Sequence, residues 1–153
     1  MDADARMDAR DDLIGSWRLV SFELEAPDGA ISHPYGEDLV GYLFYNEQGY
    51  MSSAFMSAGR SGAAEGADLA EAARVNSYDQ FMAYCGGYSV HGDRILHQVE
   101  VSSLAVWIGT RQERWFKIDG DRLEILTAPL SVDSEAPVGR LVWQRASRAV
   151  EPS

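Results

Sequence analysis

Short apolar runs and polar joints alternate along most of the chain. We interpret the runs as eight β-strands, at about residues 16–25, 39–45, 50–57, 85–91, 94–103, 110–118, 122–127 and 139–146. The joints Gly92-Asp93 and Asp119-Gly120-Asp121 are typical of tight turns, which make consecutive strands antiparallel neighbours. Because closing eight such strands removes exposed sheet edges, the pattern predicts an all-β fold. The expected fold is an eight-stranded antiparallel up-and-down barrel with room inside for one small ligand.

One segment departs from this pattern. Residues 58–66 are small and rich in glycine, and residues 67–82 then place apolar side chains at helical spacing. The positions on that apolar stripe are Leu69, Ala72, Val75, Tyr78 and Met82. We therefore expect one inserted helix near the barrel mouth, where it is either a movable lid or a fixed plug.

Two hairpins can be assigned by face, because successive residues of a strand point to opposite sides. A turn at Gly92-Asp93 places Tyr88 opposite His97, and glycine in the first turn position suits type II′. The inward face of this hairpin is predicted to hold Tyr88, Val90, Ile95, His97, Val99 and Val101. Around Gly120 the same parity predicts an inward face of Gln112, Arg114, Phe116, Ile118, Leu123, Ile125 and Thr127.

The strands at 39–45 and 50–57 are apolar on both faces, so their orientation stays open. One candidate inward face is Val40, Tyr42, Phe44, Met51, Ser53 and Phe55. The other is Leu39, Leu43, Tyr45, Tyr50 and Met56. The face left outside is expected to lie under the inserted helix or a partner subunit, which makes a homodimer one option.

Composition and charge mainly exclude classes of partner. The 153 residues accommodate one domain at 13–146, between predicted disordered tails at 1–12 and 147–153. A net charge of −11 repels phosphate backbones and anionic lipids, so neither nucleic acid nor a membrane is expected as a partner. No apolar signal segment opens the chain, and a single cysteine, Cys85, fits a reducing compartment. We therefore expect a cytoplasmic location.

The polar residues predicted to point inward are the candidates for chemistry. A buried arginine is costly unless it is paired. Arg114 therefore meets either a ligand carboxylate, enolate or carbonyl, or a partner within the protein. His97 opposite Tyr88 is either an acid–base pair or a hydrogen-bonded interior pair.

We predict His97, Tyr88 and Arg114 as catalytic residues. The predicted ligand-binding residues are Gln112, Trp107, Phe116, Val99, Tyr42, Met51, Phe55 and Tyr84. The three histidines, His33, His91 and His97, lack the spacing of a metal site, so no metal and no cofactor are expected.

A resemblance adds to this interpretation. Gly15-Ser16-Trp17 resembles the Gly-x-Trp signature of lipocalins, in which the tryptophan closes the barrel floor and an arginine of the last strand stacks across it. Arg145 is similarly placed. Residues 13–146 as a whole resemble the bacterial lipocalin-like domain proteins, which are calycin-type barrels. The similar pieces include Val40-Gly41-Tyr42-Leu43, His97-Gln98-Val99-Glu100-Val101-Ser102 and Trp107-Ile108-Gly109-Thr110. The resemblance implies a barrel with an internal cavity.

Two functions are consistent with such a cavity. The first is a cofactor-free cyclase or isomerase of secondary metabolism, which folds a hydrophobic, carbonyl-bearing metabolite into a reactive shape. The alternative is a non-catalytic binding or carrier protein for a similar small hydrophobic molecule. Chemistry requires polar groups that converge on one point, and Tyr88, His97, Gln112 and Arg114 lie on neighbouring inward strands, which favours the enzyme.

Overall fold

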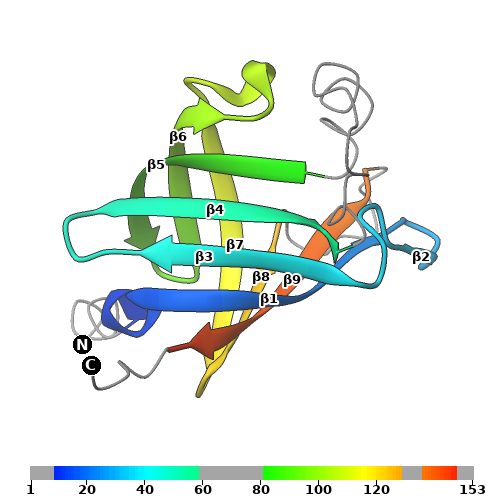
Figure 1. The fold of residues 1–153 in the computed structure, drawn as a ribbon, viewed down its shortest axis with the longest axis horizontal. Helices are drawn as coiled ribbons and strands as arrows, with labels where there is room; N and C mark the ends of the chain where they lie inside the picture. Colours follow the sequence, from blue (N-terminus) through cyan, green and yellow to red (C-terminus); the bar gives the residue numbers. More distant parts are fainter. Residues whose placement is uncertain (1–8, 59–80, 129–135, 148–153) are drawn as a thin grey trace, which may run out of the picture.

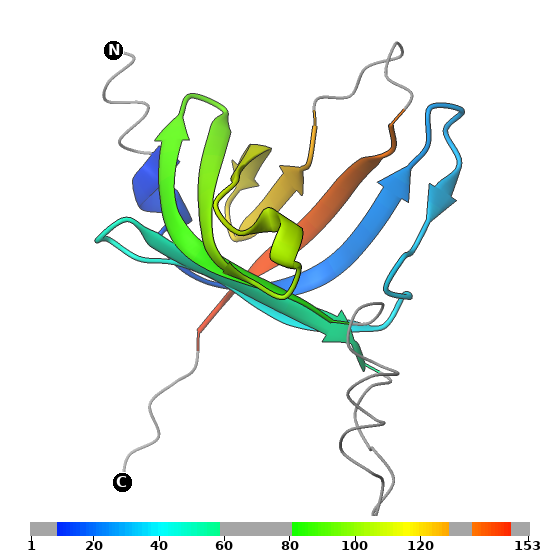
Figure 2. The ribbon, with the colours of Figure 1, turned by 90° about the horizontal axis from the view of Figure 1, so that it is seen from above.

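The structure, a computed structural model, describes residues 9–58, 81–128 and 136–147 (Figure 1). Nine strands account for most of them. They are β1 (Gly15–Glu25), β2 (Ile31–Ser32), β3 (Leu39–Tyr45), β4 (Tyr50–Ser57), β5 (Phe81–His91), β6 (Arg94–Ser102), β7 (Arg111–Asp119), β8 (Arg122–Leu126) and β9 (Val138–Ala146). A short 3-10 helix, η2 (Ala105–Trp107), follows β6 and projects beyond the strand ends (Figures 1 and 2).

The strands form a closed barrel. They are ordered β2-β1-β3-β4-β5-β6-β7-β8-β9, and β1 also pairs with β9, so eight antiparallel strands close on themselves while β2 adds a short ribbon to β1 (Figure 2). The predicted eight-stranded antiparallel barrel is therefore confirmed.

Two predicted segment boundaries are corrected. β5 begins at Phe81, so Phe81 and Met82 belong to a strand and not to the end of the predicted helix at 67–82; the rest of that helix lies outside the described residues. At the start of the chain, residues 9–13 are helical and Leu13 is fully buried. The predicted disordered tail at 1–12 is thus wrong for residues 9–12, and residues 1–8 lie outside the described part.

Two β-bulges decide which side chains point inward. In β1 the register shifts between Leu19 and Ser21, so Val20 is exposed while Leu19 and Phe22 both point into the barrel. In the β5–β6 pair the register shifts between Cys85, which pairs with Val101, and Gly86, which pairs with Val99. As a result Val101 is 62% exposed, and its predicted inward position is wrong. Tyr88, Ile95, His97 and Val99 are buried as predicted.

The β3–β4 hairpin selects the odd-numbered residues for the interior. Tyr45 pairs with Met51 and Leu43 with Ser53, and all four are buried. The inward face therefore combines half of each candidate surface, because five residues separate the paired Tyr45 and Met51, so that odd-numbered residues face odd-numbered ones. Tyr42 points outward and stacks on Phe44, with ring centroids 5.9 Å apart. No contact with a second chain is described, so a homodimer over this outer face stays a prediction.

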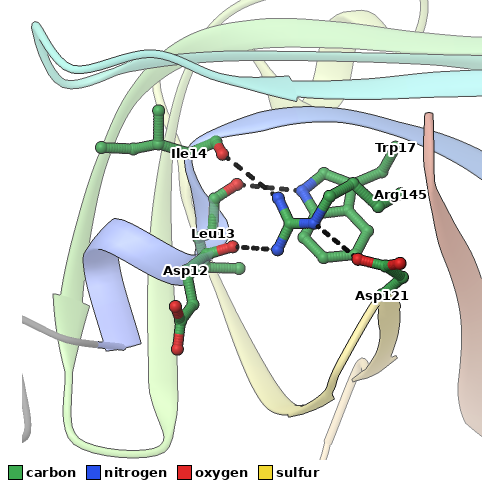
Figure 3. Close-up of polar contacts among 6 residues, drawn as sticks. All are labelled: Asp12, Leu13, Ile14, Trp17, Asp121 and Arg145. Atoms are coloured by element: carbon green, nitrogen blue, oxygen red, sulfur yellow. Dashed lines mark hydrogen bonds and ion pairs between the residues drawn. The ribbon is translucent and has the colours of Figure 1, made fainter. Parts of the chain in front are cut away.

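One end of the barrel is closed by a cluster that we call the floor, made of Asp12, Leu13, Ile14, Trp17, Asp121 and Arg145 (Figure 3). The guanidinium of Arg145 lies 4.2 Å from the ring centroid of Trp17. Its nitrogens donate to the carbonyl oxygens of Asp12 at 2.7 Å and Ile14 at 3.4 Å, and Nε lies 3.3 Å from the Asp121 carboxylate. The Trp17 indole donates to the Leu13 carbonyl at 2.9 Å. The arginine–tryptophan stack implied by the resemblance is present.

Candidate functional site

The barrel encloses a cavity of about 480 Å³, within the range of small-molecule sites. Most of its wall is apolar or aromatic. The lining residues are Phe22, Leu24, Pro34, Tyr35, Leu43, Ser53, Phe55, Met82, Tyr84, His97, Trp107, Gln112, Arg114, Ile125, Thr127, Leu141 and Trp143.

The wall has an aromatic side and a polar side. Phe22 on β1, Tyr35 and Phe55 on β4 pack on one another, with ring centroids 5.1 to 5.6 Å apart. The polar side lies on β5, β6 and β7, and the strand order places β6 half-way around the barrel from β1. The lining thus combines a cluster of three aromatic rings with polar side chains on β5, β6 and β7.

His97 is the centre of the polar side. It is fully buried, and each ring nitrogen is hydrogen-bonded to a tyrosine: Nε2 lies 2.7 Å from the Tyr45 hydroxyl and Nδ1 lies 2.6 Å from the Tyr84 hydroxyl. Burial, and then the charge of Arg114, lower the pKa of His97 from its usual 6.5 to about 3. The imidazole is therefore neutral at physiological pH.

Both tyrosines keep their protons. Burial raises the pKa of Tyr45 well above its usual 10, and the neighbouring Tyr84 raises it further. Burial also raises the pKa of Tyr84, although the nearby Arg114 acts in the opposite direction. Efficient acid–base catalysis needs a pKa near the working pH. The cluster is accordingly better suited to hydrogen bonding than to proton transfer.

Arg114 brings a positive charge to the cavity wall. Its side chain is 8% exposed, and Nη1 donates to the carbonyl oxygen of Glu113 at 2.9 Å. The guanidinium lies 5.8 Å from the ring centroid of Trp107, and its positive charge is close enough to Tyr84 to act on the pKa of that hydroxyl. Among the described residues no carboxylate lies within ion-pairing distance of it. The wall thus holds a cation without a counter-charge from the described part of the protein.

A short polar chain orients the groups beside Arg114. Gln112 Nε2 donates to Thr110 Oγ1 at 2.8 Å, and that hydroxyl donates to the Trp107 carbonyl at 2.6 Å. Trp107 in turn packs edge-on against Tyr84, with ring centroids 5.7 Å apart. On the β9 side, the buried indole Nε1 of Trp143 has no hydrogen-bond partner among the described residues.

The structure brings six of the predicted site residues to the cavity wall: His97, Arg114, Gln112, Trp107, Phe55 and Tyr84. Val99, Met51 and Phe116 are buried in the surrounding core but do not line the cavity. Two predictions are corrected. Tyr42 lies on the outer surface, 5.1 Å from the Arg18 guanidinium. Tyr88 donates to the carbonyl of Asn46 at 2.8 Å and does not contact His97 through its hydroxyl.

Sequence reasoning missed Tyr45 as a partner of His97, and Phe22 and Trp143 as wall residues. Tyr45 belonged to one of the two candidate faces of the strand at 39–45, so parity alone could not select it. Phe22 points inward because of the bulge after Leu19, which no local residue pattern marks.

Neither a metal centre nor a membrane-spanning helix is found in the described ranges. There, no group of three or more His, Cys, Asp or Glu side chains is arranged to hold a metal ion. No helix in the same ranges is long and apolar enough to cross a membrane.

The chain is similar to a curated protein and to a solved structure, and it matches one family model. A stretch of 77 residues is 36% identical to the 4'-hydroxy-3'-methoxypropiophenone carrier protein ppsC of Aspergillus oryzae, covering 44% of this chain and 69% of that protein. The crystal structure of an uncharacterized protein from Bacteroides eggerthii aligns with a TM-score of 0.45 and 11% identity, over 88% of this chain and 100% of the other. The family model described as "Lipocalin-like domain" matches residues 14–146. The chain belongs to the lipocalin-like domain family.

Proposed function

We propose that this protein binds a small, largely apolar molecule with a carbonyl or phenolate oxygen, and that it carries the molecule without transforming it. The observation on which the proposal depends is the position of Arg114. It lines a cavity of about 480 Å³ and has no carboxylate partner among the described residues. A buried cation is stabilised when a group that accepts hydrogen bonds is buried beside it. A ligand oxygen is such a group.

The related carrier supports an aromatic ketone as the class of ligand. Its name specifies a propiophenone, in which a carbonyl is attached to a substituted benzene ring. A molecule of this kind has an apolar ring for the side formed by Phe22, Tyr35 and Phe55, and an oxygen for the side formed by Tyr84 and Arg114. Offset and edge-on ring contacts favour this orientation.

The electrostatics of the polar side favour a carrier over a cyclase or isomerase. A histidine whose pKa is about 3 is a weak base at neutral pH, and tyrosines whose pKa values lie above 10 are weak acids. Such groups fix an oxygen by hydrogen bonding but exchange protons with it poorly. This supports binding without turnover.

The test is a titration of the purified protein with propiophenone, followed by tryptophan fluorescence, since Trp107 and Trp143 line the cavity. We expect saturable one-to-one binding and unchanged ligand on recovery. Ser53→Phe places a ring inside the cavity and should weaken binding at least tenfold. The matched control is Ser52→Phe, on the same strand but on the outer face, and it should bind as the wild type does. Equal affinities of the two variants, or conversion of the ligand, would contradict the proposal.

A further inference from the structure

We infer that the Tyr84 hydroxyl is the donor that binds the ligand oxygen, and that His97 and Tyr45 together turn its proton into the cavity. The inference rests on the proposed binding function and identifies the residue that selects the ligand. It follows from counting donors and acceptors along the hydrogen-bonded row Tyr45–His97–Tyr84.

The count starts at Tyr45, the buried end of the row. Its side chain is 2% exposed and does not line the cavity, and the only hydrogen bond of its hydroxyl among the described residues is the one to His97 Nε2. If Nε2 carried the imidazole proton, the Tyr45 proton would have no acceptor there. A buried donor without an acceptor destabilises the folded protein. Tyr45 therefore donates to Nε2, and the imidazole proton lies on Nδ1.

The tautomer of His97 then determines the direction of the next bond. Nδ1–H donates to the Tyr84 oxygen over 2.6 Å, so Tyr84 does not donate to His97. The positive charge of Arg114 lies near the same oxygen, and a guanidinium cannot accept a proton from it. The phenol oxygen thus accepts from Nδ1–H, and its own proton has no acceptor among the described residues.

The free proton faces the space where a ligand binds, because Tyr84 lines the cavity. A ligand oxygen that accepts hydrogen bonds satisfies this wall, whereas a group that only donates does not. Hydrocarbons of the same shape leave the Tyr84 proton unpaired. The site therefore selects for a carbonyl-type acceptor.

The first experiment compares two test ligands of similar size, propiophenone with an acceptor oxygen and propylbenzene without one. We expect the wild type to prefer propiophenone and Tyr84→Phe to lose about tenfold in affinity for it, with propylbenzene binding unchanged. Tyr88→Phe is the matched control: it removes a hydroxyl from the same strand, but one that bonds to Asn46 away from the cavity, and it should keep the wild-type preference. An undiminished ketone preference in Tyr84→Phe would overturn the inference while leaving the cavity a binding site.

The second experiment needs no variant of Tyr84 and keeps the inference testable if that variant does not fold. The 15N shifts of the imidazole nitrogens report which one is protonated, and His97 is identified by comparison with His97→Gln. We expect a protonated Nδ1 and an unprotonated Nε2 at neutral pH. The reverse tautomer would overturn the inference. Failure of the wild type to bind either test ligand would instead contradict the proposed function, whatever tautomer is observed.

Discussion

Two arginines lie over tryptophan rings in this barrel, one in the floor and one in the cavity wall, and their remaining partners differ. Arg145 stacks on Trp17 at 4.2 Å and bonds to two backbone carbonyls and the Asp121 carboxylate (Figure 3). Arg114 lies over Trp107 at 5.8 Å and, among the described residues, has the Glu113 carbonyl and the Tyr84 hydroxyl as neighbours. The same residue pair thus occurs once with a full set of partners and once without a counter-charge.

Under the proposed function, the difference separates an arginine that serves the fold from one that serves a ligand. The floor is partly open to solvent, and a carboxylate balances Arg145 there. The cavity wall is buried, and no carboxylate of the described residues balances Arg114, so the proposed ligand supplies the acceptor. Stability should therefore depend on Arg145, and binding on Arg114.

Acid should affect the cavity wall more than the floor, because His97 belongs to the wall. Its pKa is about 3 in the folded protein and near 6.5 when unperturbed, so between these values the unfolded chain binds a proton that the folded protein does not. The unfolding free energy contributed by neutral His97 therefore begins to decrease as the pH falls below about 6.5. It continues to decrease until the pH reaches about 3. At pH 4 we expect this to cost roughly 3 kcal/mol of unfolding free energy.

The measurement is urea unfolding of the wild type and of His97→Gln between pH 7 and pH 4. Carboxylates titrate in both proteins. The difference between the wild type and the variant in the slope of unfolding free energy against pH therefore reports on His97 alone. The wild type should lose more stability than the variant over this range. Parallel slopes would mean that His97 is not held neutral by the fold.

In the floor, Arg145→Met should reduce the unfolding free energy by about 2 kcal/mol, since it removes charge-assisted hydrogen bonds and a cation–π contact. Ligand affinity should change less than twofold, because Arg145 does not line the cavity. Arg122→Met, an exposed change on β8, is the control and should shift stability by less than about 0.5 kcal/mol. A loss of binding without a loss of stability in Arg145→Met would reverse the assignment of the two arginines.

The sequence predicted the barrel and much of its inward face for a physical reason. Where two residues separate paired strands, as at Gly92-Asp93, the register is fixed and alternation then gives the face of each side chain. A bulge breaks that alternation, and the bulge near Gly86 turns the side chain of Val101 outward. The glycine at position 86 signals this bulge, since a Cβ there would overlap the carbonyl oxygen of Gln98.

The partners of His97 were harder to predict than its burial. Tyr88 lies directly opposite His97 in the register, yet its hydroxyl reaches past the imidazole to Asn46. A phenol is longer than an imidazole, so the tyrosines that meet the ring nitrogens come from diagonal or more distant positions, Tyr84 and Tyr45. Side-chain length and barrel curvature decide such contacts, and alternation along a strand contains neither.

Of the floor and wall variants, Arg114→Met should change stability least. Methionine fills the volume of the side chain without its charge, so the unfolding free energy should change by less than about 1 kcal/mol, and removing the unbalanced cation favours the folded state. Affinity for propiophenone should nevertheless fall about tenfold, equivalent to about 1.4 kcal/mol. Urea unfolding measures the free energy of unfolding, and tryptophan-fluorescence titration measures the affinity.

The control is Arg18→Met, which removes the exposed arginine beside Tyr42 on the outer face. It should alter neither quantity appreciably, because water already solvates that guanidinium. If Arg114→Met binds propiophenone as tightly as Arg18→Met does, the wall cation is a structural residue like Arg145, and the distinction between wall and floor fails.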